Sequence, residues 1–277
     1  MSTLTPQPAF ATNPAGGVGV DRSPTSPWVV TGVIVRRELI LFVRQPARVA
    51  AAIGTPCLLW LFMGSGFAQS FRAPEQLGDA SYASYLLPGM MTLVAVFAAI
   101  FSSISIIQDR RDGWLQSVLV SPAPRWSIAL GKTLGGAIVA WAQAALLLAA
   151  APLLDIHLTF WAAILALLGV AATCIAMTAV GVAFAWRTET TAAFHAVMNL
   201  VFMPAWLLSG ALFPPQGASA WLELLVRLNP LSWCTQAIRG PLVGEPSLTA
   251  LAGSFVFAGA ALACATWIVS APTKRST

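Results

Sequence analysis

Residues 160–186 read FWAAILALLGVAATCIAMTAVGVAFAW and contain no charged side chain. A helix needs about 20 mainly apolar residues to cross the roughly 30 Å hydrocarbon core of a bilayer. Trp161 and Trp186 lie near the two ends of this run, about 38 Å apart at roughly 1.5 Å per residue, and tryptophan favours the two membrane–water interfaces. The segment is therefore predicted to be a transmembrane helix.

The whole chain has the composition of a membrane protein. Of its 277 residues, 57% are hydrophobic and 9% are charged, and its mean hydropathy is +0.77. A soluble domain of this size carries far more charge, because water must solvate its surface. We therefore predict an all-α polytopic fold with six transmembrane helices, at about residues 49–67, 84–107, 133–154, 160–186, 193–212 and 248–270.

The other segments suggest a chain of three parts. Residues 1–27 are rich in Pro, Gly, Ser and Thr and lack an apolar core, so a disordered tail is expected rather than a signal peptide. Residues 28–45 form a separate amphipathic segment, and residues 46–272 form the transmembrane domain.

Basic residues predict the orientation of the chain. Six spans place both termini on one side, and of the 15 lysines and arginines only Arg72, Arg227 and Arg239 fall on the other side. Because cytoplasmic loops carry the excess of Lys and Arg, both termini are expected in the cytoplasm. The net charge of +5 marks this orientation, and no nucleic-acid partner is expected.

The segment 28–45, WVVTGVIVRRELILFVRQ, is too charged to span a membrane and ends before Pro46. On a helix, Arg37 and Arg44 lie within about 20° of each other, away from the side of Ile40 and Val43. This pattern favours an interfacial helix on the inner leaflet with its arginines near lipid phosphates. A plain basic flank of the first span is the alternative. The residues assigned to this helix are Arg36, Arg37, Glu38 and Arg44.

Residues 108–132, QDRRDGWLQSVLVSPAPRWSIALGK, form a charged insert between two long apolar runs. An apolar stripe follows its first residues at i, i+1, i+4 and i+5 spacing, with Asp112 and Gln116 on another face. Pro122 and Pro124 should end this short helix. A stripe of this kind suits docking into a groove of a partner protein, or it lies flat on the membrane. Its residues are Trp114, Leu115, Val118 and Leu119.

Gly131-Lys132-Thr133 has the ending of a phosphate-binding P-loop but not its beginning. The motif needs a glycine five positions before Gly131, where Trp126 stands, and an apolar span follows instead of a soluble helix. No ATP site is therefore predicted here. Gly131 and Gly135 are instead expected to let two helices approach closely.

The external segment 213–247 contains two short helical patterns separated by Asn229-Pro230. In the first pattern Trp221, Leu225 and Leu228 share a face, while Glu223 and Arg227 can pair at i, i+4. Both pieces are too short to span the bilayer. They are expected to dip into the outer leaflet or to pack over the end of the bundle, because water tolerates such apolar surface poorly.

Groups typical of an enzyme or of an ion-coupled carrier are missing from the sequence. There is no His-Glu-x-x-His, no Gly-x-Ser-x-Gly and no pair of carboxylates inside a span, so no catalytic or metal-binding residue is predicted. Every Asp and Glu lies near a loop or an interface, whereas a carrier driven by protons or sodium usually needs ionisable groups near the midplane. The energy for transport should therefore enter through the cytoplasmic insert.

Three stretches resemble the integral-membrane subunits of type-2 ABC transporters, the ABC-2 permeases. RRELILFVRQP (residues 36–46) is similar to the interfacial helix of that family, and DRRDGWLQSVLVSPAPRWSIALGK (residues 109–132) to its cytoplasmic loop. Residues 207–240 resemble its external signature, with Ser-Gly, Phe-Pro, Asn-Pro-Leu and a terminal Arg. The resemblance covers about residues 28–270.

The resemblance implies six spans, two permeases per complex and two separate cytoplasmic ATPase subunits. The short cytoplasmic helix would then be a coupling helix seated in an ATPase groove, formed by Asp112, Gly113, Trp114, Leu115, Gln116, Val118 and Leu119. Many relatives have a glutamate where this chain has Gln116, so a salt bridge to the ATPase is not expected there. The segment 213–239 would form re-entrant helices that close the outer end, with Phe213, Pro214, Trp221, Leu225, Asn229, Pro230, Leu231 and Arg239.

On this resemblance, the chain would be the permease subunit of an ATP-driven exporter in a bacterial-type plasma (inner) membrane. Its cargo would be hydrophobic or amphipathic: a drug, a lipid or a lipid-linked glycan. The chain would hold no cofactor, with ATP and Mg on the ATPase subunits, and its other partners would be a second permease copy or paralogue and membrane lipids. An ion-driven secondary transporter and a membrane-embedded assembly factor or enzyme remain the alternatives.

Overall fold

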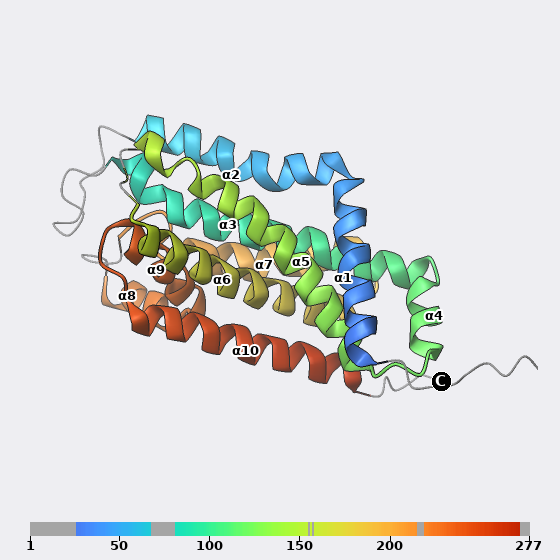
Figure 1. The fold of residues 1–277 in the computed structure, drawn as a ribbon. Coiled ribbons are helices and arrows are strands. Elements are labelled where there is room, and N and C mark those ends of the chain that lie inside the picture. The colour runs from blue at the N-terminus through green and yellow to red at the C-terminus, as the bar shows by residue number, and fades with distance from the viewer. Residues whose placement is uncertain (1–25, 68–80, 155, 157, 215–218, 272–277) are drawn as a thin grey trace, which may run out of the picture.

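The computed structural model describes residues 26–67, 81–154, 156, 158–214 and 219–271, and every regular element among them is a helix. In chain order the elements are α1 (Pro27–Val43), α2 (Pro46–Gly66), α3 (Tyr82–Arg111), α4 (Trp114–Val120), α5 (Arg125–Leu148), the 3₁₀ turn η2 (Ala151–Leu154), α6 (Phe160–Arg187), α7 (Thr191–Leu207), α8 (Ala220–Leu228), α9 (Pro230–Leu242) and α10 (Leu248–Ser270). The long helices run side by side and form a bundle (Figure 1).

Five segments among the described residues are long and apolar enough to cross a membrane. They are Val49–Gly66, Tyr82–Arg111, Arg125–Leu154, Phe160–Arg187 and Leu248–Ser270. The predicted all-α polytopic fold is confirmed at this level. Of the predicted tail 1–27, residues 1–25 lie outside the described part of the chain.

The remaining predicted span, residues 193–212, corresponds to α7. This apolar helix has 17 residues, or about 25 Å at roughly 1.5 Å per residue, which is shorter than a full crossing of the hydrocarbon core. The chain leaves the helix after Leu207 and turns at Gly210, whose φ is 73°. The count of six spans therefore stays a prediction.

The charged insert is mostly helix. α3 continues to Arg111 and α5 begins already at Arg125, so both helices extend beyond the predicted spans. Gly113 has a φ of 76°, a left-handed conformation that glycine adopts without strain, and the chain turns there into α4. Pro124 precedes α5, in agreement with the predicted end of the short helix.

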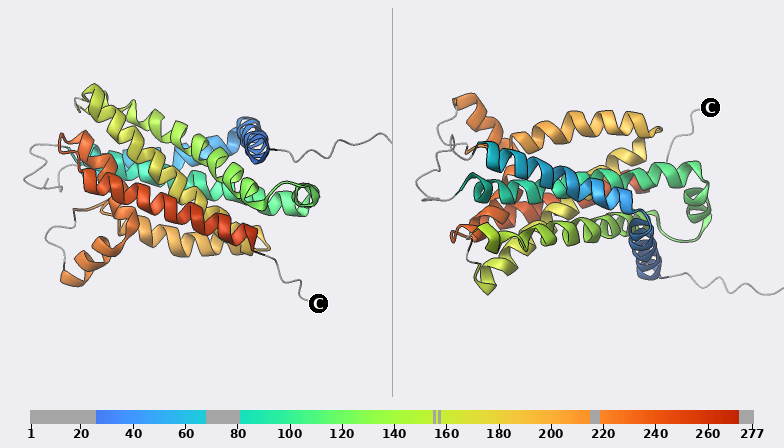
Figure 2. Two further views of the ribbon diagram at one scale, coloured as in Figure 1. Left: turned by 60° about the horizontal axis from the view of Figure 1, so that its bottom comes forward. Right: turned by 90° about the horizontal axis from the view of Figure 1, so that it is seen from above.

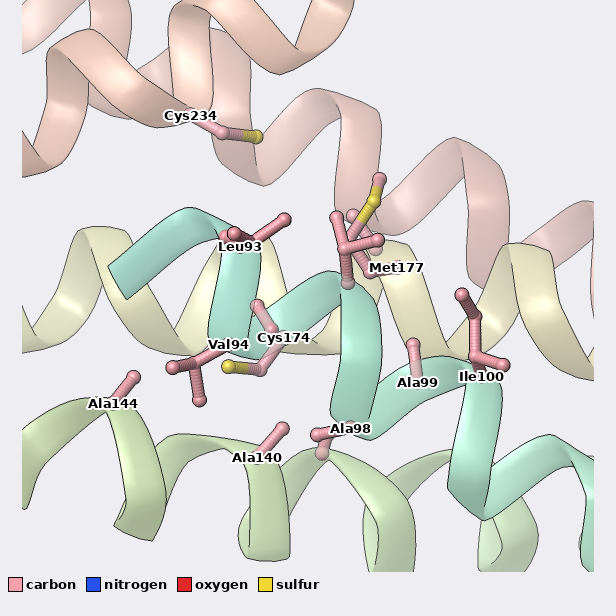
Figure 3. Close-up of a cluster of buried hydrophobic side chains, with 14 of the residues drawn as sticks. Leu93, Val94, Ala98, Ala99, Ile100, Ala140, Ala144, Cys174, Met177 and Cys234 are labelled. Atoms are coloured by element: carbon pink, nitrogen blue, oxygen red, sulfur yellow. The ribbon is translucent and has the colours of Figure 1, made fainter. Parts of the chain in front are cut away.

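The central helix of the bundle is α3. In the most apolar stretch of α3, 83% of the residues are buried, whereas the corresponding stretches of α2 and α10 are 17% and 28% buried. Small side chains of α5 and α6 allow these helices to pack closely on α3, as Figure 3 shows for Leu93, Val94, Ala98, Ala140, Ala144, Cys174 and Met177. The exposed apolar surface of the bundle therefore belongs mainly to α2 and α10.

The two ends of the bundle carry different structures (Figures 1 and 2). At one end, α1 crosses the bundle axis and α4 follows the last turn of α3. At the other end lie α8 and α9. We call these the basic end and the opposite end. The charged insert lies at the basic end, because it runs from the last turn of α3 through α4 to the start of α5.

Candidate functional site

Two acidic and two basic side chains meet where α1, α3 and α5 come together at the basic end. Arg37 donates from Nη2 to Asp109 Oδ1 at 2.5 Å and from Nη1 to Asp109 Oδ2 at 3.0 Å. Lys132 donates from Nζ to Glu38 Oε1 at 2.6 Å and also to Asp109 Oδ2. The formal charges of these four residues, the ion cluster, cancel.

The ion cluster is buried. Lys132, Asp109 and Glu38 are 3%, 4% and 6% exposed, while the side chain of Arg37 is 27% exposed. Ser105 donates to Glu38 Oε2 at 3.0 Å, so each of the four carboxylate oxygens accepts a hydrogen bond. Breaking a buried ion pair leaves an uncompensated charge, so the cluster fixes α1, α3 and α5 relative to one another.

Two glycines of α5 bring Glu38 into the cluster. A Cβ at Gly131 would lie 2.8 Å from Ile34 Cβ, and a Cβ at Gly135 would lie 2.8 Å from Glu38 Cβ. Side chains at these positions would therefore push α1 away from α5. The predicted close approach at Gly131 and Gly135 is confirmed, and α1 is the helix that uses it.

Trp114, the first residue of α4, covers the ion cluster. The guanidinium carbon of Arg37 lies 3.7 Å from the centroid of the indole ring, and Lys132 Nζ lies 5.4 Å from it. A cation over an aromatic face is attracted by the electron density of the ring. The next residue, Leu115, is 2% exposed, so α4 is attached to the bundle through two consecutive side chains.

The apolar stripe of α4 faces the protein itself rather than a free surface. Leu115 is buried, and Trp114, Val118 and Leu119 pack partly buried against the core. These side chains therefore already contact the bundle in the described part of the chain. The exposed residues of α4 are Gln116, Ser117 and Val120, the last 87% exposed. The assignment of α4 to partner docking stays a prediction.

The arginines of α1 do not share one role. Arg36 and Arg44 are exposed, as expected for a helix on a membrane surface. Arg37 was expected near lipid phosphates, but it turns inward to Asp109, because the carboxylate offers a bidentate partner. Figure 1 shows α1 lying across the bundle axis, which is the direction that an interfacial helix requires.

A second contact joins the end of α3 to the end of α6. Arg110 donates from Nη2 to the carbonyl oxygen of Trp186 at 2.7 Å and from Nη1 to that of Thr188 at 2.9 Å. These carbonyl groups lie at the carboxyl end of a helix, where few backbone donors remain and a positive charge is favourable. Asp109 therefore binds the last turn of α3 to α1 and α5, and Arg110 binds it to the end of α6.

The sequence patterns did not indicate the chemical role of these residues. Lys132 was considered only as part of an incomplete P-loop, and Asp109, Arg110 and Ser105 were not considered as a site. The available signal was the charge itself, since Glu38 directly precedes the apolar run of residues 39–43 and Asp109 stands two residues after the predicted span that ends at residue 107. Buried charges require partners, but the sequence does not show which ones.

A cavity of about 150 Å³ adjoins the ion cluster, between α1, α3 and α5. Arg37, Glu38 and Asp109 form part of its polar wall, and Phe42 and Phe101 form part of its apolar wall. The cluster therefore lies at the boundary between polar surroundings and the apolar interior of the bundle.

The predicted external residues lie at the opposite end. Asn229 connects α8 with α9, and its Nδ2 donates to the carbonyl oxygen of Ala205 at 2.6 Å. Arg227 pairs with Glu223 at 2.6 Å, as predicted. Leu231 is buried and Arg239 lies near Tyr85, while the remaining residues are half-buried or exposed: Phe213, Pro214, Trp221, Leu225 and Pro230. Their role as a gate stays a prediction.

Residues 30–243, which extend from α1 to the end of α9, match the family described as ABC-2 type transporter. The chain belongs to this family. The permease is thus a membrane transport subunit, and membership in an ABC permease family implies association with ATPase subunits. The resemblance drawn from three short motifs is confirmed over most of the chain.

Relatives of the permease include transport proteins of several organisms. It is 27% identical over 211 residues to the transport permease ycf38 of Cyanophora paradoxa, covering 75% of this chain and 72% of that protein. It is 29% identical over 173 residues to the multidrug ABC transporter permease YbhR of Escherichia coli (strain K12), covering 61% of this chain and 46% of YbhR. Nodulation protein J of Rhizobium leguminosarum bv. viciae is 25% identical over 247 residues, covering 85% of this chain and 86% of that protein.

Proposed function

We propose that this permease is the membrane-spanning subunit of an ATP-driven exporter, and that a separate ABC subunit hydrolyses the ATP. The distribution of acidic groups supports this source of energy. In the described part of the chain, the carboxylates lie at the two ends of the bundle: in the ion cluster, near α4, between α6 and α7, and around α8 and α9. Transport coupled to an ion gradient usually needs such a group near the membrane midplane.

The attachment of α4 carries the proposal. Trp114 rests on Arg37 and Lys132, and these two cations bind Glu38 and Asp109. A displacement of α4 by a partner would therefore act at once on α1, α3 and α5. The exposed Val120, with Gln116 and Ser117, is the surface that we assign to the ATPase.

The proposed complex contains two ATPase subunits, which hold ATP and Mg, and a second permease copy or paralogue. The exposed apolar face of α2 supports such a neighbour in the membrane, since Leu58, Leu61 and Phe62 are 55%, 59% and 66% exposed, and apolar surface of this extent needs lipid or protein cover. Six spans and cytoplasmic termini in a bacterial-type inner membrane complete the arrangement. An apolar path would then run at the interface of the two permeases.

The proposed cargo is a hydrophobic or amphipathic molecule, such as a drug, a lipid or a lipid-linked glycan. The apolar surface of the bundle and the similarity to YbhR, which is named as a multidrug permease, support this class.

Co-purification with an ABC ATPase tests the proposal. The permease is co-expressed with each ABC ATPase of its source genome, and complex formation and ATP hydrolysis are measured. Val120→Asp should abolish both, because it places a charge on the proposed docking face. Leu153→Asp is the matched control, since Leu153 is 83% exposed in η2 at the opposite end, and it should leave both unchanged.

Retained ATPase binding by the Val120→Asp variant would contradict docking through α4. Transport driven by an ion gradient in vesicles without any ATPase would favour a secondary transporter instead. Function in detergent without nucleotide dependence would favour an assembly factor or enzyme.

A further inference from the structure

The cavity beside the ion cluster carries a surplus of negative charge. Its charged wall consists of Arg37, Glu38, Asp109 and Asp112. Together with Lys132, the first three form the ion cluster, whose formal charges cancel. In the part of the chain that the structure describes, no ion pair within 4.0 Å includes Asp112. Asp112 therefore leaves the cavity with one uncompensated negative charge.

Asp112 lies at the C-cap of α3. The carbonyl groups at the carboxyl end of a helix carry a partial negative charge, which favours a nearby cation. Arg110 binds carbonyl groups at the end of α6, and Arg111 is exposed and does not line the cavity. The carboxylate and the end of the helix thus attract a cation at the same place.

The cations of the ion cluster are already engaged. Lys132 has three N–H donors, and its Nζ contacts Glu38, Ser105 and Asp109. Arg37 binds Asp109 through two nitrogens and lies over the ring of Trp114. A phosphate or carboxylate ligand would have to displace a buried carboxylate from these cations, so the cavity disfavours an anion.

The cavity also has an apolar wall, to which Leu41, Phe42 and Phe101 belong. Binding sites for small molecules typically combine such a wall with a few polar groups, and an aromatic ring attracts a cation to its face. A cavity of about 150 Å³ is large enough for a group the size of benzene, which is also the size of a small alkylammonium group. The cavity lies where α1, which crosses the bundle axis, meets the bundle (Figure 1).

We propose that this cavity binds the ammonium group of an amphipathic amine, with Asp112 as its carboxylate partner and Phe42 and Phe101 beside its alkyl part. The amine is the headgroup of an aminophospholipid or a free molecule with a protonated amino group and an apolar tail. The proposed export function is not a premise of this inference, because the site consists of this chain alone.

Native mass spectrometry of the full-length permease in a neutral detergent tests the site without nucleotide, ATPase or transport. Phosphatidylethanolamine is titrated in one arm and dodecylamine, protonated at neutral pH, in a second arm. Asp112→Asn should weaken the binding of these amines about fivefold or more, because a charge-assisted contact is lost. The variant should fold, since Asp112 is exposed and its side chain makes no ion pair among the described residues.

Glu189→Gln is the matched control for charge. Glu189 is exposed in the turn between α6 and α7, at the same end of the bundle, and does not line the cavity. This variant removes the same charge and should leave the binding of both amines within about twofold. Dodecanol is the matched neutral probe, and its binding should not respond to Asp112→Asn.

A second pair of variants tests the position of the amine. Leu41→Trp places a larger side chain on the wall of the cavity and should weaken the binding of dodecylamine and phosphatidylethanolamine about fivefold. Ile40→Trp is its control, because Ile40 is the neighbouring residue of α1, is 42% exposed and does not line the cavity. It should leave both affinities within about twofold.

A loss in the phosphatidylethanolamine arm alone assigns the ammonium group to a lipid headgroup, a loss in the dodecylamine arm alone assigns it to a free amine, and a loss in both arms shows that the site accepts both. Unchanged binding of both amines by Asp112→Asn would overturn the proposal, and so would an equal loss in Glu189→Gln or an equal effect of Asp112→Asn on dodecanol. Unchanged binding by Leu41→Trp would place the amine outside the cavity and would also overturn it. Because the assay contains no ATPase, its failure would leave the proposed exporter function standing, and a failure of that function would leave this binding result intact.

Discussion

Replacing Lys132 with methionine should destabilise the permease far more than the loss of an exposed ion pair. Lys132 is 3% exposed and donates to Glu38, Asp109 and Ser105. Methionine preserves most of the side-chain volume but leaves two buried carboxylates with Arg37 as their one cation. Removing one partner of a buried ion pair costs about 3–5 kcal/mol, so we expect a loss of this size in the free energy of unfolding.

Titration with SDS in mixed micelles measures this loss through tryptophan fluorescence, since the chain has 11 tryptophans. Arg227→Gln is the control, because the side chains of Arg227 and Glu223 are 75% and 41% exposed, and an exposed pair contributes about 1 kcal/mol or less. The double variant Lys132→Met with Glu38→Gln removes one charge of each sign and leaves the Arg37–Asp109 pair. It should recover about 2 kcal/mol relative to the additive value.

A loss below about 1 kcal/mol for Lys132→Met would refute the interpretation of the ion cluster as a structural joint. Additive losses in the double variant would also refute it, because they would show that Lys132 and Glu38 do not interact.

Two further substitutions test the helix contacts around the cluster. Gly131→Ala should cost about 1–3 kcal/mol of unfolding free energy in the same titration, because its Cβ would lie 2.8 Å from Ile34 Cβ. The control Gly259→Ala enters open space and should be neutral or slightly stabilising. Equal effects of the two substitutions would argue against the close crossing of α1 and α5. Arg110→Gln removes two hydrogen bonds to carbonyl groups at the end of α6 and should cost about 1–3 kcal/mol, with faster hydrogen exchange at residues 186–190. Unchanged exchange there would show that Arg110 does not hold this turn.

Local patterns were sufficient to predict the helices of the permease. Apolar runs located the five described segments that are long enough to cross a membrane, and Pro46, Pro122 and Pro124 separated the short helices from the long ones. These signals are local, because a helix needs only its own periodicity and the residues that end it. The glycine spacing at Gly131 and Gly135 also predicted a close crossing, although not that α1 makes it.

The partners of the charged side chains could not be predicted. Arg37 and Arg44 share a helix face by sequence, yet Arg37 turns inward to Asp109 and Arg44 stays exposed. The difference arises from residues 72 positions apart in the chain, and periodicity carries no information about such contacts. The contacts of the α4 stripe within the bundle could not be predicted for the same reason, since an amphipathic helix packs equally well on its own protein or on a partner.

Site-specific photo-crosslinking tests the central claim most directly, namely that α4 receives the ATPase. A photoreactive amino acid replaces Val120 in one sample and Leu153 in the other, two residues that are 87% and 83% exposed at the two ends of the bundle. The permease is irradiated in membranes that contain the co-expressed ABC ATPase. We predict an adduct of permease and ATPase from position 120 and none from position 153. No adduct at position 120, with the complex still formed, would contradict the account.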